Sequence, residues 1–355
     1  MGIFKKFLTI EGLDLSRQIF LSNFGITPLP YKVTFALTYK CQLKCKYCMT
    51  WDRPEKKELS LNEIKLIIGS MKNLRWLHFT GGEIFSRPDI GDILDFVIEH
   101  KRLAVLTLPT NGTNSQNIVN IVKRVSKRMK YTRMIITCSL DGRKEVHDKL
   151  RGVEGVYDEC METFRQLRII PGVDAYIGMT VSQDNYRELP LLLPVIREKI
   201  PDFGFNEFHL NFVGRSFFYN NETNDSEKLI NIDIYEYINK MRRDYRKNSK
   251  KFFLEDKYFI LMEDYLKDRK IPIGCSAARG SCFIDAYGDV YPCIHYKIKL
   301  GNLEISDYNF KKFWKTYPGK NKLRDSIDNK ECFGCWTPCE AYPTILSNLF
   351  YVTKK

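Results

Sequence analysis

The sequence predicts an α/β protein in which a partial (βα)6 barrel is followed by a small cysteine-rich domain. Two observations support this prediction. Short apolar runs alternate with amphipathic stretches over the first 213 residues, and six of the eleven cysteines gather after residue 270. Strict alternation of strands and helices implies parallel strands joined by right-handed crossovers. Six such units are too few for a closed eightfold barrel, so we expect an open or partial one.

The expected elements follow from apolar runs and from helix start signals. Ser60 stands before the first helical pattern as an N-cap, and Glu63 follows three residues later, as in a capping box. Because the carboxyl ends of parallel strands meet at one rim, residues that directly follow strands should lie together. The expected strands are 32–38, 74–80, 103–109, 133–140, 173–181 and 205–213, and the expected helices are 62–71, 89–100, 115–129, 157–170 and 189–200.

Changes in composition divide the chain into five segments. The expected segments are an apolar and basic arm at 1–30, the barrel at 31–213, a polar helical connector at 214–270, the cysteine-rich domain at 271–342 and an apolar tail at 343–355.

The formal net charge of +13 favours an anionic partner unless it reflects a lysine-rich surface. The densest basic run, at 241–251, holds a single aromatic residue, so it is typical of a solvated face rather than of a surface that stacks bases. No separate RNA-binding domain is visible either, and nucleic acid is not an expected partner.

No apolar run is long enough to span a bilayer, and Glu11 and Asp14 interrupt the N-terminal apolar stretch, which does not fit a secretory signal. A cytoplasmic protein is therefore expected. Its eleven cysteines should be reduced, and they are better explained as metal ligands than as disulfides.

Three cysteines, Cys41, Cys45 and Cys48, occupy eight positions directly after the first expected strand. A structural zinc site, the alternative here, uses four ligands. A cubane iron–sulfur cluster also normally takes four thiolates. Three thiolates on one loop would therefore leave one iron without a protein ligand. A catalytic cluster needs such an open iron, because a substrate or cofactor can bind there.

The C-x3-C-x2-C spacing after the first strand of a βα series resembles the radical S-adenosylmethionine (radical SAM) superfamily. The resemblance implies that Cys41, Cys45 and Cys48 are the catalytic ligands of a [4Fe–4S] cluster, and that its open iron chelates the amino and carboxylate groups of S-adenosylmethionine (SAM). It also implies reductive cleavage of SAM to methionine and a 5′-deoxyadenosyl radical, with a flavodoxin- or ferredoxin-type electron donor. Tyr47 stands where the family has an aromatic residue near the adenine.

Motifs after the later strands extend the resemblance to roughly residues 31–213. "TGGE" ends at Glu83, "TNG" holds Asn111, and "SLDG" and "HDKLRG" hold Ser139 and Arg151. Glycine permits close backbone approach, and a carboxylate suits an ammonium group. The resemblance assigns the SAM ammonium to the glycine motif and its glutamate, and the ribose and SAM carboxylate to the serine and arginine. The implied cofactor-binding residues are Tyr47, Gly81, Gly82, Glu83, Asn111, Ser139 and Arg151.

The second cysteine group resembles the SPASM/twitch extension of radical SAM enzymes, which binds one or two auxiliary [4Fe–4S] clusters. Cys275, Gly288 and Cys293 match its "C…G-x4-C" half, and Cys332 and Cys335 match its C-x2-C half. The central spacing of the two-cluster version is missing, so one auxiliary cluster is expected. Its expected ligands are Cys275, Cys293, Cys332 and Cys335. Cys339 is a rival for one of these places and Cys282 is a weaker rival. The alternative to an iron–sulfur cluster is a zinc ribbon. Cys138 and Cys160 are expected to be core residues.

The expected chemistry is hydrogen abstraction from an unactivated C–H bond, followed by oxidation, cross-linking or carbon–carbon bond formation. About 40 residues precede Cys41, too few for a strand and a peptide-leader-binding module. We therefore expect a small-molecule or lipid-like substrate (a lipid, a polyprenyl-linked compound or a sugar). The alternatives are a maturase of a ribosomal peptide or protein, and a two-cluster electron-transfer protein, which would not need the SAM motifs.

Both chain ends are apolar with basic residues. Lys5 and Lys6 lie among phenylalanines and leucines at the N-terminus, and the stretch 342–355 ends in two lysines. Two explanations stay open. Both ends pack as helices on the open side of the barrel, or they form an interfacial arm that rests on an anionic membrane surface.

Overall fold

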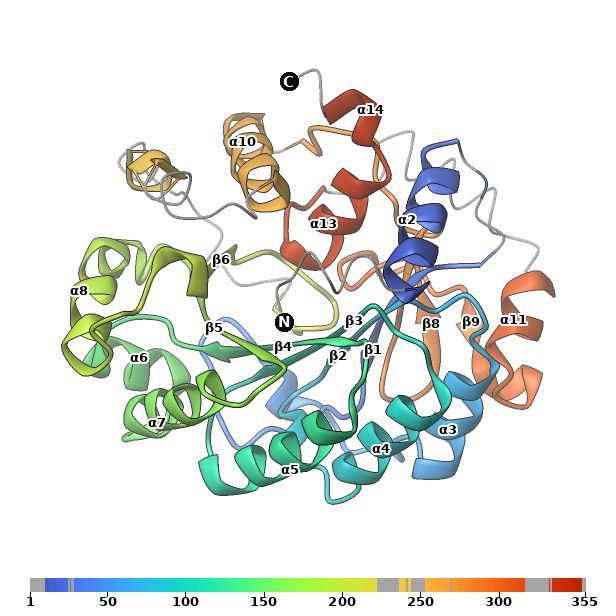
Figure 1. The fold of residues 1–355 in the computed structure, drawn as a ribbon, viewed down its shortest axis with the longest axis horizontal. Coiled ribbons are helices and arrows are strands. Elements are labelled where there is room, and N and C mark those ends of the chain that lie inside the picture. The colour runs from blue at the N-terminus through green and yellow to red at the C-terminus, as the bar shows by residue number, and fades with distance from the viewer. Residues whose placement is uncertain are drawn as a thin grey trace.

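The computed structural model describes residues 10–24, 26, 29–221, 236–240, 242–243, 253–268, 270–316, 332 and 334–352 of the chain. Within these residues the strands form one mixed sheet in the order β6-β5-β4-β3-β2-β1-β7-β8-β9 (Figure 1). The strands are β1 Lys32–Ala36, β2 Trp76–Thr80, β3 Val105–Thr110, β4 Arg133–Ser139, β5 Val173–Val181, β6 Phe208–Phe212, β7 Ser281–Ile284, β8 Asp289–Tyr291 and β9 Gly301–Asn302.

The six expected strands are all present, and each pairs in parallel with the next along the chain. This confirms the α/β class. Buried and half-buried residues alternate along β3, β4, β5 and β6, whereas every residue of β1 is buried. A strand that is covered on both faces belongs in the middle of a parallel sheet. β1 has this place, between β2 and β7.

One helix or, between β4 and β5, the two helices α6 and α7 connect each pair of consecutive strands from β1 to β6. Helices α3, α4, α5 and α7 line the outer side of the sheet in Figure 1. The predicted capping box is confirmed, because the Ser60 amide donates to Glu63 Oε2 at 2.7 Å and the Glu63 amide donates to Ser60 Oγ at 3.4 Å. The helix α6, which contains most of the "HDKLRG" motif, was not predicted. The helices are α2 Ile10–Asn23, α3 Leu61–Ser70, α4 Ile90–His100, α5 Ser115–Arg128, α6 Lys144–Arg151, α7 Val156–Arg168, α8 Leu189–Lys199, α10 Phe253–Asp268, α11 Phe310–Thr316, α13 Pro338–Leu346 and α14 Leu349–Val352.

The cysteine-rich segment adds a seventh parallel strand to the sheet. β7 pairs with β1, with Lys32 opposite Ser281 and Phe35 opposite Ile284. β8 and β9 then continue the sheet in antiparallel order. The expected boundary at residue 271 therefore does not interrupt the hydrogen bonding of the sheet. The domain limits given above stay a prediction.

Helix α2 packs between the sheet and the end of the chain. Leu15 and Ile19 are buried in a small cluster with Tyr31, against Leu346 and Leu349. On the outer side Phe20, Phe24 and Phe350 are each more than half exposed. Their rings contact one another, with centroids 5.0 Å apart for Phe20 and Phe24 and 5.8 Å apart for Phe24 and Phe350.

Parts of the predicted ends and of the basic run lie outside the described residues, namely 1–9, 241, 244–251 and 353–355. Among the helices of the described part, none is both long and apolar enough to cross a membrane.

Candidate active site

The three cysteines after β1 line one cavity at the carboxyl end of the sheet. Cys45 is buried, and Cys41 and Cys48 are partly exposed. Burial raises the pKa of the Cys41 thiol to about 12 and that of the Cys45 thiol to about 11. Metal binding requires the thiolate form and stabilises it, so loading of this site is expected to release protons.

The glycine pair after β2 holds the backbone of the cysteine loop. The Gly82 amide donates to the Thr38 carbonyl at 2.8 Å, and the Glu83 amide donates to the Lys40 carbonyl at 2.9 Å. A Cβ on Gly81 would lie 2.4 Å from the Thr38 oxygen, and one on Gly82 would lie 2.1 Å from the Lys40 oxygen. Both positions therefore require glycine for the close approach of two chain segments.

The end of α6 holds the other side of the loop. The Lys44 amide donates to the Arg151 carbonyl at 3.0 Å, and the Lys46 amide donates to the Leu150 carbonyl at 2.9 Å. Gly152 ends the helix in the left-handed conformation, at a φ of 71°. A Cβ there would lie 2.6 Å from the Lys44 oxygen. The "HDKLRG" motif is thus a helix end that supports the loop.

Asp141, which follows β4, joins this helix end to the cavity. Its fully buried carboxylate accepts from the Tyr47 hydroxyl and pairs with the Arg151 guanidinium at 2.5 Å. Burial and the Asp141 carboxylate raise the pKa of Tyr47 above its usual range, so the phenol keeps the proton that it donates. Arg151 Nη1 lies 3.7 Å from Cys45 Sγ. Arg151 Nε is buried and has no hydrogen-bond partner within the described residues.

His147, the first residue of the "HDKLRG" motif, has a structural role. Burial lowers its pKa to about 4, so the ring is neutral. Its Nδ1 accepts from the Asp141 amide at 3.0 Å. The histidine therefore orients the turn that carries Asp141 rather than facing the cavity. Asp141 belongs to the "SLDG" motif, to which the sequence analysis assigned a role only for Ser139.

Glu83 is buried, and its carboxylate joins the loops after β2 and β3. Oε1 accepts from the Phe85 amide and the Thr110 hydroxyl, both at 3.0 Å, and Oε2 accepts from the Asn111 amide at 2.7 Å. Burial raises the pKa of Glu83 to about 7 against the effect of these donors. Glu83 is not among the described residues that line the cavity. Its part in binding the SAM ammonium stays a prediction.

The other six expected cofactor-binding residues all line the cavity. Asn111 directs its side-chain amide towards Cys41 Sγ, at 3.9 Å, and its Oδ1 accepts from Thr113. The structure thus brings to one place motifs that lie up to 110 residues apart in the chain. The six are Tyr47, Gly81, Gly82, Asn111, Ser139 and Arg151.

Residues that sequence reasoning missed complete the cavity wall. Asn211 on β6 and Tyr219 contribute to it, together with His295 and Thr337 from the cysteine-rich segment. His295 Nδ1 lies 2.8 Å from the Arg215 carbonyl, and Nε2 lies 3.2 Å from Thr337 Oγ1. A carbonyl only accepts, so Nδ1 is the donor to Arg215. In the sequence, the one signal for His295 and Thr337 was their position, because each stands two residues after an expected cysteine ligand, Cys293 and Cys335 respectively.

Four of the cysteines after residue 270 influence one another. Burial raises the pKa of the Cys293 thiol most, and Glu340, Cys335, Cys275 and Cys332 add to the rise. These charge effects place the four thiols in the same region of the molecule. Their assignment as ligands of one cluster stays a prediction.

The two rival cysteines have other surroundings. Cys282 lies on β7, wholly buried in the main core, and Cys339 packs against an aromatic cluster around Phe218 and Phe283. Beyond burial, the pKa of Cys339 responds to Lys32 and Glu340. Within the described residues, no group of three or more His, Cys, Asp or Glu side chains is arranged to hold a single metal ion. Cys138 and Cys160 are fully buried in the core, as predicted.

Two family profiles match the chain. That of the radical SAM superfamily matches residues 35–189, and that of SPASM, an iron–sulfur cluster-binding domain, matches residues 275–336. The chain belongs to the radical SAM superfamily. Its cofactors are accordingly SAM and a [4Fe–4S] cluster, and its SPASM domain implies auxiliary iron–sulfur binding, as predicted, in place of the zinc alternative.

Several known proteins are similar to this radical SAM protein. The subtilosin biosynthesis protein AlbA of Bacillus subtilis is 29% identical over 292 residues, which cover 79% of this chain and 59% of AlbA. An AdoMet-dependent heme synthase of Oleidesulfovibrio alaskensis is 26% identical over 307 residues, covering 80% of this chain and 74% of the synthase. The structure of Streptococcus suis SuiB bound to its precursor peptide SuiA shares the fold, with a TM-score of 0.61 at 18% identity, over 88% of this chain and 71% of SuiB.

Proposed function

We propose that this protein is a radical SAM maturase that modifies a ribosomally made peptide or protein. The observation that carries the proposal is the cavity itself, which is lined both by the three-cysteine loop and by His295 and Thr337 of the cysteine-rich segment. The names of AlbA and SuiB support a peptide substrate. The lipid, polyprenyl-linked or sugar substrate expected from the sequence finds no support among these relatives, and the peptide alternative fits them better.

The residues present fit the cofactors that the family implies. Cys41, Cys45 and Cys48 would hold the [4Fe–4S] cluster and leave one iron for SAM. Arg151 lines the cavity, and its buried Nε has no hydrogen-bond partner within the described residues, so the SAM carboxylate would be a suitable acceptor for this side chain. With the cluster reduced by a flavodoxin- or ferredoxin-type donor, bound SAM would supply a 5′-deoxyadenosyl radical for hydrogen abstraction.

The protein's own contribution is orientation and the exclusion of water. Asp141 fixes the guanidinium of Arg151 and the ring of Tyr47, so neither has to be ordered when SAM binds. Ser139 and Asn111 add polar groups on the same wall. Glu83 ties the two loops that carry Gly82 and Asn111 to each other. We assign the cofactor-binding roles on this basis.

The cavity wall favours an uncharged substrate group. Among the described residues that line it, Arg151 is the only one with a permanent charge, and Asp141 already pairs with it. Asn211, Tyr219 and Thr337 offer neutral hydrogen-bonding groups instead. A heme precursor with several carboxylates would lack cationic partners here, so the heme synthase relatives are the weaker guide to the substrate.

The proposal is tested with anaerobically reconstituted protein, SAM, a reductant and a synthetic peptide encoded next to the gene. We expect 5′-deoxyadenosine, together with a change in peptide mass that corresponds to oxidation or cross-linking. Cys48→Ala is the inactive control. An iron porphyrin precursor serves as the competing substrate. Turnover of the porphyrin and not of the peptide would contradict the proposal.

A position at the membrane surface is a second, separate proposal. The exposed rings of Phe20 on α2, Phe24 just after it and Phe350 on α14 form one apolar patch. An apolar patch on a basic protein suits the headgroup region of an anionic bilayer. The substrate assignment does not depend on it.

A further inference from the structure

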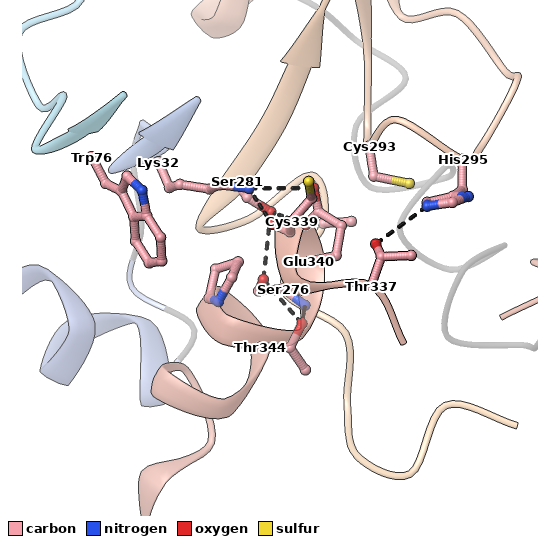
Figure 2. Close-up of polar contacts among 12 residues, drawn as sticks. Lys32, Trp76, Ser276, Ser281, Cys293, His295, Thr337, Cys339, Glu340 and Thr344 are labelled. Atoms are coloured by element: carbon pink, nitrogen blue, oxygen red, sulfur yellow. Dashed lines mark hydrogen bonds and ion pairs between the residues drawn. The ribbon is translucent and has the colours of Figure 1, made fainter. Parts of the chain in front are cut away.

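A lysine is buried where the SPASM segment meets the barrel. Lys32, the first residue of β1, is wholly buried, and its Nζ donates to the Cys339 carbonyl and lies 3.8 Å from Glu340 Oε1. Nζ also lies 5.9 Å from the centre of the Trp76 ring. Figure 2 shows Lys32 extending from β1 towards Cys339 and Glu340 at the start of α13. Burial of such a pair costs free energy that good geometry only partly returns.

Hydroxyl groups continue this contact to the first cysteine of the SPASM domain. Ser281 Oγ donates to Glu340 Oε2 at 2.7 Å, and Ser276 Oγ lies 3.4 Å from Ser281 Oγ and 3.2 Å from Thr344 Oγ1. The Ser276 amide also donates to Thr344 Oγ1 at 3.1 Å. Ser276 follows Cys275 directly, so the network fixes that cysteine's segment against α13 (Figure 2).

The same pair also lies directly against the cysteine-rich segment. Lys32 Nζ donates to the backbone carbonyl of Cys339, and Glu340 is the next residue in the chain. Charges in a buried region are screened much less than charges at the surface. Both side chains are almost completely buried, with exposed fractions of 1% and 3%.

We propose that Lys32 and Glu340 are positioning residues of the auxiliary iron–sulfur cluster that set its reduction potential through their two opposite charges. One-electron reduction makes a cluster more negative by one charge. A nearby cation therefore favours reduction, and a nearby anion opposes it. In the intact pair the two effects largely cancel, and the cluster keeps a potential that a change in either residue would disturb.

The test is a redox titration of the anaerobically reconstituted full-length protein, followed by electron paramagnetic resonance. SAM alters the spectrum of the cluster to which it binds, so the signal that SAM leaves unchanged reports the auxiliary cluster. At the wild-type midpoint potential, Glu340→Gln should raise the ratio of reduced to oxidised auxiliary cluster about tenfold, and Lys32→Met should lower it about tenfold. The double variant should return close to the wild-type value.

Asp174→Asn is the matched control. It breaks an ion pair between Asp174 on β5 and Arg133 on β4, which lie several strands away from β1 and β7 in the sheet. It should leave the auxiliary potential unchanged. Shifts of the potential in the same direction for Lys32→Met and Glu340→Gln, or no shift in either variant, would overturn the proposal. If either single variant fails to hold the auxiliary iron, retention of that iron by the neutral double variant supports the charge argument, and its loss contradicts it.

Discussion

The two cysteine groups of this protein are held in opposite ways. The first lies on one loop, and backbone hydrogen bonds to Gly82, Leu150 and Arg151 fix that loop from both sides. The second is spread over 65 residues, and side chains such as Lys32 and Glu340 bring its segments together. A site built from one loop depends on local sequence. A site built from distant segments depends on the packing of the whole molecule.

The largest expected effects separate the two sites chemically. Cys48→Ala should lower the iron content from about eight to about four per chain and abolish 5′-deoxyadenosine formation. Cys335→Ala should lose a similar amount of iron and yet still cleave SAM without substrate. Iron analysis and chromatography of the nucleoside measure both. Cys282→Ala is the control and should keep all the iron; iron loss in that variant would make Cys282 a ligand.

The next effect concerns the backbone contacts of the first loop. Gly152 and Gly155 both have positive φ, 71° and 86°, but an added Cβ meets the Lys44 oxygen at the first and nothing within 4 Å at the second. Gly155→Ala should cost about 1–2 kcal/mol of unfolding free energy, from conformation alone. Gly152→Ala should cost about 1–3 kcal/mol more and reduce iron at the first site. Urea titrations and iron analysis of the two variants test this; equal losses would show that the contact is unimportant.

Glu83 gives a pH-dependent prediction. Its folded pKa of about 7 lies above the ordinary 4.5, so its contribution to stability is fully present below about pH 4.5 and is lost as the pH rises through about 7. The stability of the wild-type protein should therefore fall between about pH 5 and about pH 8 relative to that of Glu83→Gln, which cannot titrate.

Urea unfolding of both proteins at the two pH values measures this difference, and parallel behaviour would contradict it. Calorimetric titration of the same variant with SAM tests the separate prediction that Glu83 binds the ammonium. A loss of about 1.5–3 kcal/mol would support that role. Unchanged affinity would leave Glu83 with its observed role, in which it joins the loops that contain Phe85 and Asn111.

The smallest expected effect concerns the outer surface. Replacing Phe20, Phe24 and Phe350 together by serine should weaken co-sedimentation with anionic liposomes and leave both iron sites intact. Salt should weaken the binding of the wild-type protein. Exposed Leu66 on α3 and Ile169 after α7 offer control positions away from the patch. Equal binding of the wild-type protein to neutral and anionic vesicles would end the membrane proposal.

Sequence patterns predicted the α/β fold, its six parallel strands and most of the motifs that line the cavity, because each signal was local. Strand periodicity, the Ser60 capping box and motifs that directly follow strands need no knowledge of distant contacts. The place of β7 beside β1 could not be predicted, because nothing in the sequence sets one four-residue strand against another about 250 residues earlier. The ion pair of Lys32 with Glu340 depends on that pairing and was hidden for the same reason.

Function followed a similar division. The cofactors were predicted, since cysteine spacing determines them. The substrate was not, because it depends on a wall formed by residues from several elements, such as Asn211, Tyr219 and His295. The glycines of the "TGGE" motif also have a second explanation that the sequence did not reveal, which is contact with the cysteine loop itself.

The pairing of β7 with β1 has a consequence for the ancestry of the molecule. A domain gained as a separate module leaves its host intact when it is removed, but here removal would uncover one whole edge of the strand that precedes Cys41. An unpaired strand edge invites association with other chains. Lineages that lose the cysteines of this extension are therefore expected to keep its first hairpin, as a remnant that covers the edge after the metal chemistry has gone.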